Sequence, residues 1–304
     1  MSTFDPDALE CLAAIVEEGG FERAARHLSI TQSAVSQRLR ALEAQVGTVL
    51  IVRCRPLKAT SAGQLLLKHT KMLRLLRADL ERDLKELAPS SLRGARAEER
   101  ISIAINADSI ASWALPALTG LAQSGLPMEI IADDQDFTHE WLRQGQVLGC
   151  VTTLKQVLRG CKVVALGAME YVAVATPALA QERLGAQGLT AHNFRDIPFI
   201  AFNRKDDMQS EFVSLAFGLK HVTLNQLFVP SSEGQLRAVL AGWGVSVVPR
   251  LLAQGLIDQK LLVNLVPACV LPIQLYWHCW NLESEVLDAL TAALTQSAAL
   301  ALVA

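Results

Sequence analysis

The first ninety residues repeat apolar side chains every three or four positions, which predicts a series of helices. The clearest of these helices runs from about Gln32 to Val46. One face is apolar and carries Val35, Leu39, Leu42 and Val46. At ~100° per residue the opposite face is polar, with Ser33, Ser36, Gln37 and Arg40. Thr31 precedes the helix and is placed to cap it through its hydroxyl.

Two earlier helices and a short strand complete the amino-terminal pattern. The segment Asp5-Pro6-Asp7 begins a first helix, which Gly19-Gly20 ends. A second helix starts at Phe21 and leads through a tight turn near Leu28–Ile30 into the helix described above. The apolar run Val49–Val52 predicts a strand, and residues 53–58 the tip of a β-wing. We therefore expect an all-α, winged helix-turn-helix domain over residues 1–59.

Residues 60–88 predict one long linker helix, because the stretch has no internal proline. Its apolar positions form a seam, spaced by threes and fours, of Leu66, His69, Leu73, Leu76, Leu80, Leu84 and Leu87. Such a seam is typical of paired helices, so we expect a homodimer joined through this helix. Proline, serine and glycine in the stretch that follows predict a hinge at residues 89–100.

From Ile101 onward short strands alternate with helices, which is the pattern of an open α/β sheet. Two of the strands are expected at Val163–Leu166 and Tyr171–Ala175. The chain crosses between two comparable halves near Val151–Leu158 and Leu265–Pro272. We therefore expect an α/β domain over residues 101–304, with a cleft between its halves. Subdomain I would contain residues 101–158 and 268–304, and subdomain II residues 159–267.

Composition narrows the class of protein. The chain has 304 residues, 51% of them hydrophobic, yet no apolar run approaches the ~20 residues of a membrane span. Its start lacks a basic segment before an apolar core, so we expect a cytoplasmic protein. The six cysteines and six histidines are scattered, and no nucleophile elbow, phosphate loop or dinucleotide fingerprint is present. We expect no metal, no cofactor and no enzymatic activity.

Positive charge is concentrated near the amino end. Between Gly20 and Arg77, eleven Lys and Arg residues stand against two acidic residues, in a chain whose net charge is −2. A polar helix face is often merely solvated, but this surplus on a helix-turn-helix pattern favours contact with double-stranded DNA. The expected contacts are Thr31, Gln32, Ser33, Ser36, Gln37, Arg38, Arg40, Arg53, Arg55 and Lys58. For the three wing cations, the alternative is that they are ordinary loop charges.

These residues occur in the order that characterises one family. Ala24-Ala25, Leu28, Thr31–Ser36, Leu42-Glu43 and Thr60–Gly63 resemble the headpiece of the LysR-type transcriptional regulators. The resemblance implies a DNA-binding regulator whose α/β part is similar to a periplasmic binding protein and binds an effector between its subdomains. Dimers, and dimers of dimers forming a homotetramer, would bind a pseudo-palindromic operator. Two recognition helices of a dimer would reach half-sites ~34 Å apart. RNA polymerase is a further candidate partner.

Polar groups follow several strands of the α/β part, where helix N-termini expose N–H groups that can hold a carboxylate. The turns in question carry Asn106, Asp108, Ser109, Thr152, Thr153, Ser231, Ser232 and Glu233. For the serines, the alternative is that they only cap helices. Acidic residues gather at the same strand ends, which favours a cationic ligand, although such residues also commonly face water. Asp134, Phe202 and Asp207 complete the expected effector site.

A second resemblance concerns the effector. Ile105–Ser109, Leu115–Leu118, Ala201–Met208, Ser231–Glu233 and Leu275–His278 resemble the arginine- and lysine-responsive branch of the family, the ArgP/LysG (IciA) type. This resemblance implies lysine or arginine as effector and genes of amino-acid export or metabolism as targets. The α-carboxylate would meet the Ser/Thr/Asn turns, and the side-chain cation would meet an aspartate.

One alternative function stays open at this point. The chain would then be an architectural or replication-modulating DNA-binding protein, and its α/β part would only oligomerise. Adding lysine or arginine would leave DNA binding by such a protein unchanged, whereas it would alter DNA binding by an effector-responsive regulator.

Overall fold

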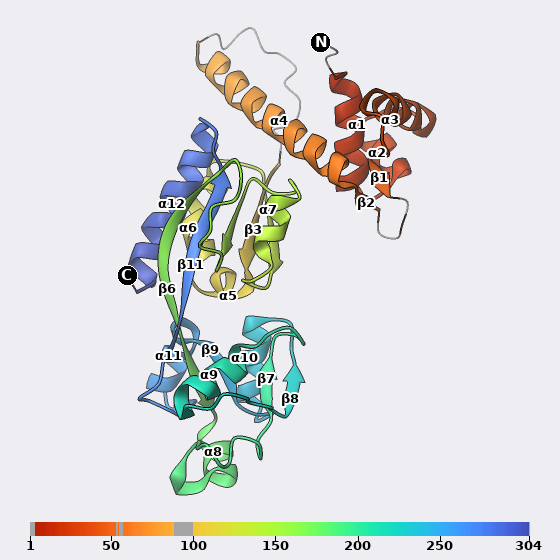
Figure 1. Cartoon of the computed structure of the whole chain (residues 1–304). Coiled ribbons are helices and arrows are strands. Elements are labelled where there is room, and N and C mark those ends of the chain that lie inside the picture. The colour runs from red at the N-terminus through yellow and green to blue at the C-terminus, as the bar shows by residue number, and fades with distance from the viewer. Residues whose placement is uncertain (1–3, 53, 55–56, 88–99, 304) are drawn as a thin grey trace.

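A computed structural model describes residues 4–52, 54, 57–87 and 100–303 (Figure 1). The chain forms a helical headpiece, a long helix α4 (Ser61–Leu87) and an α/β body of two lobes. In Figure 1, α4 runs between the headpiece and the first lobe, and the second lobe lies at the far end of the molecule. Within these residues, no helix is both long and apolar enough to cross a membrane.

The headpiece contains three helices and a short wing. These elements are α1 (Pro6–Glu17), α2 (Phe21–His27), α3 (Gln32–Val46), β1 (Ile51–Val52) and β2 (Lys58–Ala59). Thr31 caps α3 as expected, since its Oγ1 accepts from the Ala34 N–H at 3.1 Å. The apolar helix faces meet in one core that includes Leu12, Ile15, Val35, Leu39 and Leu42. The structure thus confirms the winged helix-turn-helix arrangement.

The backbone around Leu50 explains three residues of the headpiece pattern. The Glu43 Oε1 accepts from the Leu50 N–H at 2.9 Å, which ties the end of α3 to the wing. Thr60 donates to the Val49 carbonyl at 2.8 Å and accepts from the Gly63 N–H at 3.1 Å. Gly63 lies so close to the Leu50 carbonyl that any Cβ at this position would collide with its oxygen. These residues therefore hold α4 against the wing.

Helix α4 has a buried face and an exposed apolar face. Leu67 and Leu75 are buried against the rest of the chain. Much of the predicted seam is exposed on the opposite side, at Leu73, Leu76, Leu80 and Leu84. Leu66 instead packs against the headpiece core, and the side chain of Leu87 lies outside the described residues.

Charged groups fasten α4 to both of its neighbours. The Arg74 Nε donates to Glu10 at 2.8 Å, and its Nη1 pairs with Glu17 at 3.1 Å, both in α1. The Lys71 Nζ pairs with Glu17 at 3.1 Å and donates to the backbone carbonyl of Gln146, in the first lobe, at 2.7 Å. Through these contacts the headpiece, α4 and the body meet at one junction.

The first lobe is built on a mixed sheet. Its strands are β3 (Ile101–Asn106), β4 (Met128–Asp133), β5 (Gly149–Thr152), β6 (Cys161–Ala175) and β11 (Leu271–Trp280). Strand β3 pairs in parallel with β4 and β5, whereas β11 pairs antiparallel with β5 and β6. The helical elements are α5 (Ala107–Ser109), a π-helical turn (Ile110–Ala114), α6 (Leu115–Gln123), α7 (Thr138–Arg143) and α12 (Glu285–Ala301). Helix α12 packs against α6, β6 and β11, and α7 packs against β3 and β5.

The second lobe contains shorter elements. Its strands are β7 (Phe199–Ala201), β8 (Gln226–Phe228), β9 (Ser246–Pro249) and β10 (Val263–Asn264). Its helices are α8 (Pro177–Arg183), a 3-10 turn (Gly185–Gln187), α9 (Met208–Phe217), α10 (Ser232–Leu240) and α11 (Arg250–Asp258). Strands β7 and β8 pair in parallel, and α9 and α10 both contact β7 and β9.

Strand β6 belongs to both lobes. It pairs with β11 along much of its length, and residues 171–175 also pair with β9 and β10. The strands predicted at Val163–Leu166 and Tyr171–Ala175 are therefore one strand, and their predicted separation is wrong. Gly167 lies between them with φ at +119°, but β11 continues the pairing past it with a bulge between Leu275 and Tyr276. The two lobes thus share continuous strands.

The contact between Gly63 and Leu50 predicts the effect of a single methyl group. Gly63→Ala should lower the free energy of unfolding by about 1–3 kcal/mol, because the new Cβ overlaps a backbone oxygen that cannot move freely. Gly120→Ala in α6 is the matched control, since nothing lies within 4 Å of its Cβ position. This control should stabilise the protein by up to about 1 kcal/mol. Urea unfolding followed by circular dichroism measures both, and equal effects would contradict the packing described here.

Candidate functional site

The polar face of α3 is open to solvent. Thr31, Gln32, Ser33, Gln37 and Arg40 are exposed, and Ser36 is half-buried. In Figure 1, α3 lies on the side of the headpiece that faces away from the two lobes. The only acidic residue in the sequence of α3, Glu43, is bonded to the Leu50 N–H. This face therefore offers amide, hydroxyl and guanidinium donors to a DNA groove.

Two side chains predicted to contact DNA, Arg38 and Thr31, form bonds within the headpiece. Arg38 forms an ion pair with Asp7 of α1 at 2.9 Å, so it joins α3 to α1. The Thr31 hydroxyl accepts the capping bond from Ala34, although the residue itself is exposed. On the wing, Lys58 is exposed in β2, whereas Arg53 and Arg55 lie outside the described residues.

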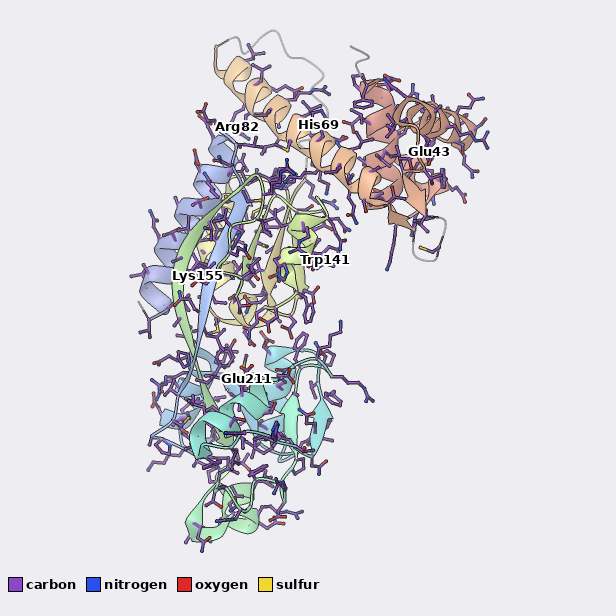
Figure 2. All side chains as sticks on the ribbon, in the orientation of Figure 1. Glu43, His69, Arg82, Trp141, Lys155 and Glu211 are labelled. Atoms are coloured by element: carbon purple, nitrogen blue, oxygen red, sulfur yellow. The ribbon has the colours of Figure 1, made fainter. Side chains whose placement is uncertain are left out.

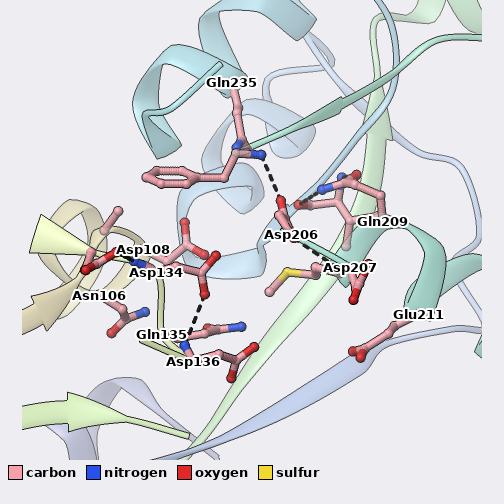
Figure 3. A pocket seen from close by; sticks show the side chains of 15 residues that line it. Asn106, Asp108, Asp134, Gln135, Asp136, Asp206, Asp207, Gln209, Glu211 and Gln235 are labelled. Atoms are coloured by element: carbon pink, nitrogen blue, oxygen red, sulfur yellow. Dashed lines mark hydrogen bonds between the residues drawn. The ribbon is translucent and has the colours of Figure 1, made fainter. Parts of the chain in front are cut away.

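A pocket lies between the two lobes (Figure 3). Its volume is about 570 Å³, a figure that includes space open to solvent. The first lobe contributes residues 106–108, at the end of β3, and residues 133–136, at the end of β4. The second lobe contributes Phe202, residues 206–209 and Glu211, Gln235 and Val247. Figure 2 shows Glu211 at the junction of the lobes.

The lining of this pocket is strongly acidic. Seven carboxyl groups line it, from Asp108, Asp133, Asp134, Asp136, Asp206, Asp207 and Glu211. Among the described residues that line it, none is Lys, Arg or His. No group of three His, Cys, Asp or Glu side chains in the described residues is arranged to hold a metal ion. The negative charge therefore points to an organic cation as ligand.

Asp108 is the most deeply placed of these carboxyl groups. Its Oδ2 accepts from the Tyr171 hydroxyl at 2.6 Å, and that hydroxyl also lies 3.3 Å from the Gln135 Oε1. Burial raises the pKa of Asp108, while the nearby Ser232 and Tyr171 hydroxyls oppose the rise. Burial and the Asp108 carboxyl together raise the pKa of Tyr171.

Asp134 and Asp206 face the same space from opposite lobes. Burial raises the pKa of Asp134 to about 6, against a hydrogen bond from the Asp136 N–H at 3.1 Å. Burial also raises the pKa of Asp206, although its carboxylate accepts from the backbone N–H groups of Phe202 at 2.8 Å and Met208 at 3.0 Å. Neighbouring carboxyl groups raise both values further.

One buried amide in the pocket has no partner among the residues that the structure describes. Asn106 is only 2% exposed, and neither its Nδ2 nor its Oδ1 forms a hydrogen bond to a described residue. Ser232 is also buried, and its Oγ lies near Asp108 without a well-formed hydrogen bond. An unsatisfied buried polar group costs about 1–3 kcal/mol. A ligand that bonds to Asn106 would recover that cost.

The structure brings together part of the predicted effector site. Asn106, Asp108, Asp134, Phe202 and Asp207 line the pocket. Six others are not among the lining residues: Ser232 lies near Asp108, and the remaining five have partners in the protein. The hydroxyls of Ser109, Thr152 and Thr153 bond to Trp113, the Gln135 carbonyl and Asp136 respectively, Ser231 caps α10, and Glu233 pairs with Arg237. They support the lining from behind or lie beside it.

Sequence reasoning missed several residues of the lining. Gln135 and Asp136 follow Asp134 directly, and the run of polar residues after a strand was the available signal. Gln209 is 1% exposed and Gln235 is 5% exposed, both on helices. Gln209 accepts from the Val247 N–H at 2.8 Å, a contact between distant segments that no local pattern shows.

Comparison with known proteins gives the family. Residues 6–64 match the model of the bacterial regulatory helix-turn-helix proteins of the lysR family, and residues 94–299 match the LysR substrate binding domain. The transcriptional regulator ArgP of Pseudomonas aeruginosa is 37% identical over 292 residues, which cover 96% of this chain and 95% of that protein. The regulator LysG of Mycobacterium tuberculosis is 38% identical over 287 residues, which cover 94% and 91%.

Solved structures agree with these matches. The crystal structure of ArgP from Mycobacterium tuberculosis has a TM-score of 0.83 and 37% identity, with 99% of each chain covered. Full-length LysG from Corynebacterium glutamicum, solved with bound effector Arg, has a TM-score of 0.72 and 34% identity, with 99% of this chain and 100% of that chain covered. The two relatives compared by sequence are both named as helix-turn-helix transcriptional regulators. The chain belongs to the LysR family of bacterial helix-turn-helix transcriptional regulators.

Proposed function

We propose that the pocket between the lobes binds a basic amino acid, L-arginine or L-lysine, and that this effector sets how the protein acts on its operator. The observation that carries the proposal is the lining of seven carboxyl groups without a basic residue among the described lining residues. A basic amino acid supplies two cationic groups and one carboxylate, which reduces the repulsion between those groups. The relative solved with bound arginine supports the same ligand class.

Polar groups that line the pocket or lie beside it suit the rest of such a ligand. The unpartnered Asn106 amide can donate to the α-carboxylate, and the Ser232 hydroxyl at the N-terminus of α10 can do the same. We assign the cationic groups to the carboxyls of Asp108, Asp134 and Asp206, which are the more buried ones. Asp207 is exposed at the rim and would contribute a weaker attraction. In this arrangement Ser109, Thr152, Thr153, Ser231 and Glu233 shape the site without touching the ligand.

The headpiece would bind operator DNA through the exposed face of α3. Gln32, Ser33, Ser36, Gln37 and Arg40 are the candidates for base contacts, with Thr31 at the helix start. Lys58, and in the sequence pattern Arg53 and Arg55, are the candidates for phosphate contacts. A protein with this target acts in the cytoplasm, on genes of amino-acid export or metabolism.

The exposed stripe on α4 supports a dimer. Leu73, Leu76, Leu80 and Leu84 are each more than 40% exposed, and a second α4 would cover them. Two headpieces would then reach two half-sites ~34 Å apart, and two such dimers would form the expected dimer of dimers. RNA polymerase remains a candidate partner on the promoter.

Effector binding can change DNA binding only if the effector prefers one arrangement of the protein. The pocket is lined by both lobes, so a ligand that bonds to both favours the arrangement in which they are close. The architectural alternative leaves the acidic pocket and the unpartnered Asn106 without a role, and no observation favours it.

The exposed glutamine Gln37 of α3 should read base edges in the operator. Gln37→Ala should weaken binding to a selected operator by about 1–3 kcal/mol, because a bidentate base contact is lost. Binding to random DNA should change little, since phosphate contacts remain. Gln181→Ala, an exposed glutamine of α8 in the second lobe, is the matched control. Fluorescence anisotropy on both DNAs measures the difference, and an equal loss on operator and random DNA would contradict the assignment.

Charge on the ligand and the burial of each aspartate should decide the affinity of the pocket. L-arginine and L-lysine should raise the melting temperature, whereas L-citrulline, which lacks the guanidinium charge, should not. Asp108→Asn should lower affinity for L-arginine at least tenfold, because a buried charge-assisted contact contributes about 1.5–3 kcal/mol. Asp207→Asn should lower it about two- to fivefold, since exposed pairs contribute up to about 1 kcal/mol. Isothermal titration calorimetry ranks the variants, and citrulline binding as tight as arginine binding would refute the proposal.

Charges placed on the exposed stripe of α4 should separate the subunits. Leu76→Glu and Leu80→Glu should at least halve the mass of the oligomer, because a buried carboxylate has no partner in the seam. Leu251→Glu, an equally exposed leucine of α11, should leave the mass unchanged. Sedimentation velocity measures the masses. An oligomer that survives both seam variants would place the dimer interface elsewhere.

A further inference from the structure

When the pocket holds no cation, ionising all of its carboxyl groups is unfavourable, because they are partly buried and repel one another. Asp108 and Asp134 come from the first lobe and Asp206 from the second, and all three titrate in one another's field. Asp136, Asp207 and Glu211 are further carboxyl groups around them, and burial together with the carboxyls of Asp136, Asp207 and Asp206 raises the pKa of Glu211. Carboxyl groups that share a buried space commonly retain protons near neutral pH.

Groups on the surrounding elements do not neutralise this cluster. From β6, Tyr171 donates a hydrogen bond to Asp108 but carries no charge. From α7, Trp141 donates to Asp133, and its neighbour His139 pairs with Glu140. Lys205 lies over the Phe137 ring, 4.7 Å from its centroid, and Arg204 lies over Phe228. None of these cations lines the pocket.

The Asn106 amide is an independent sign that a ligand completes this space. It is buried, it lines the same pocket, and both of its polar atoms lack a partner among the described residues. An acidic cluster that only faced water would not require such a group beside it. The cluster and the amide together describe a site that is unsatisfied in charge and in hydrogen bonding until it is occupied.

We propose that the cluster of Asp108, Asp134 and Asp206 holds protons in the empty protein and that a cationic effector displaces them, so that effector binding releases protons and strengthens as pH rises. This inference rests on the proposed function, since it takes the basic amino acid as the ligand. Occupancy of the pocket would then depend on both the effector concentration and the cytoplasmic pH. A falling pH would have the same effect as a falling effector concentration.

The direction of the pH dependence follows from the protonation state of the carboxyl groups in the empty and in the occupied pocket. The empty pocket raises the pKa of Asp134 to about 6 and also raises those of Asp108 and Asp206. A bound cation stabilises the carboxylates and lowers these values again. Below the raised pKa the groups are protonated when empty, so binding must expel protons; well above it they are already ionised, and binding expels none. Affinity therefore rises with pH and levels off above the raised pKa.

Calorimetry of the full chain with L-arginine tests this directly. The titration is run at pH 6.0 and at pH 7.5, each in PIPES and in ACES, which differ in their heat of ionisation. The difference in binding heat gives the protons exchanged. Asp134 alone should release about half a proton at pH 6.0 and almost none at pH 7.5. Between pH 5.5 and 7.5 its titration should raise affinity about fourfold, and more if Asp108 and Asp206 contribute.

Variants test whether the released protons come from the cluster or from other groups of the protein. Asp134→Asn and Asp206→Asn should each reduce the proton release at pH 6.0 and flatten the dependence of affinity on pH. Asp258→Asn, an aspartate bonded to Gln254 outside the pocket, should change neither. The readout is the number of protons and the pH slope, so a variant that only weakens binding is distinguished from one that removes a titrating group.

The outcomes are separable. Binding of L-arginine with the same heat in both buffers at pH 6.0, or with proton uptake, overturns the inference and leaves the proposed function standing. Proton release that persists unchanged in both cluster variants also overturns it. Absence of binding by L-arginine and L-lysine at both pH values overturns the proposed function and this inference with it.

Discussion

Like charges held in one partly buried space impose the main constraint on this protein. The two lobes bring carboxyl groups toward each other from Asp108, Asp134 and Asp206, and each gains from a cation between them. Without one, their mutual repulsion favours separation of the lobes or retention of protons. Strand β6 pairs with strands of both lobes and so connects them. The charge in the pocket therefore affects the spacing of the two lobes.

The headpiece depends on a different constraint, which is close approach of backbone to backbone. Gly63 and Thr60 hold the start of α4 against the strand that leads into the wing, and Glu43 ties the end of α3 to the same strand. These residues are part of the family pattern, and the contacts described for them lie within the protein. The family sequence pattern therefore contains residues that position α3 as well as residues on its exposed polar face.

Sequence predicted the elements better than the assembly of the site. Helical period and capping placed α3 at Gln32–Val46, because both are local properties. Asn106, Asp108 and Asp134 were found because they follow strands, and strand ends meet at one edge of the sheet. Gln209 and Gln235 were missed because helical position alone does not tell a buried glutamine from a solvated one. Strand β6 was divided at Gly167 because its continuity depends on pairing with β11, far away in sequence.

The junction at Lys71 has a mechanical consequence. Gly145 of the first lobe lies directly against the backbone of Lys68, and Lys71 is bonded to Gln146, so α4 is gripped near its headpiece end. From Lys71 to Leu87 the helix extends ~24 Å at 1.5 Å per residue. A rotation of about 5° about this fulcrum moves the distal end by roughly 2 Å. In a dimer paired along α4, the two helices would be displaced together, so a rotation in one subunit would also move the helix of the other.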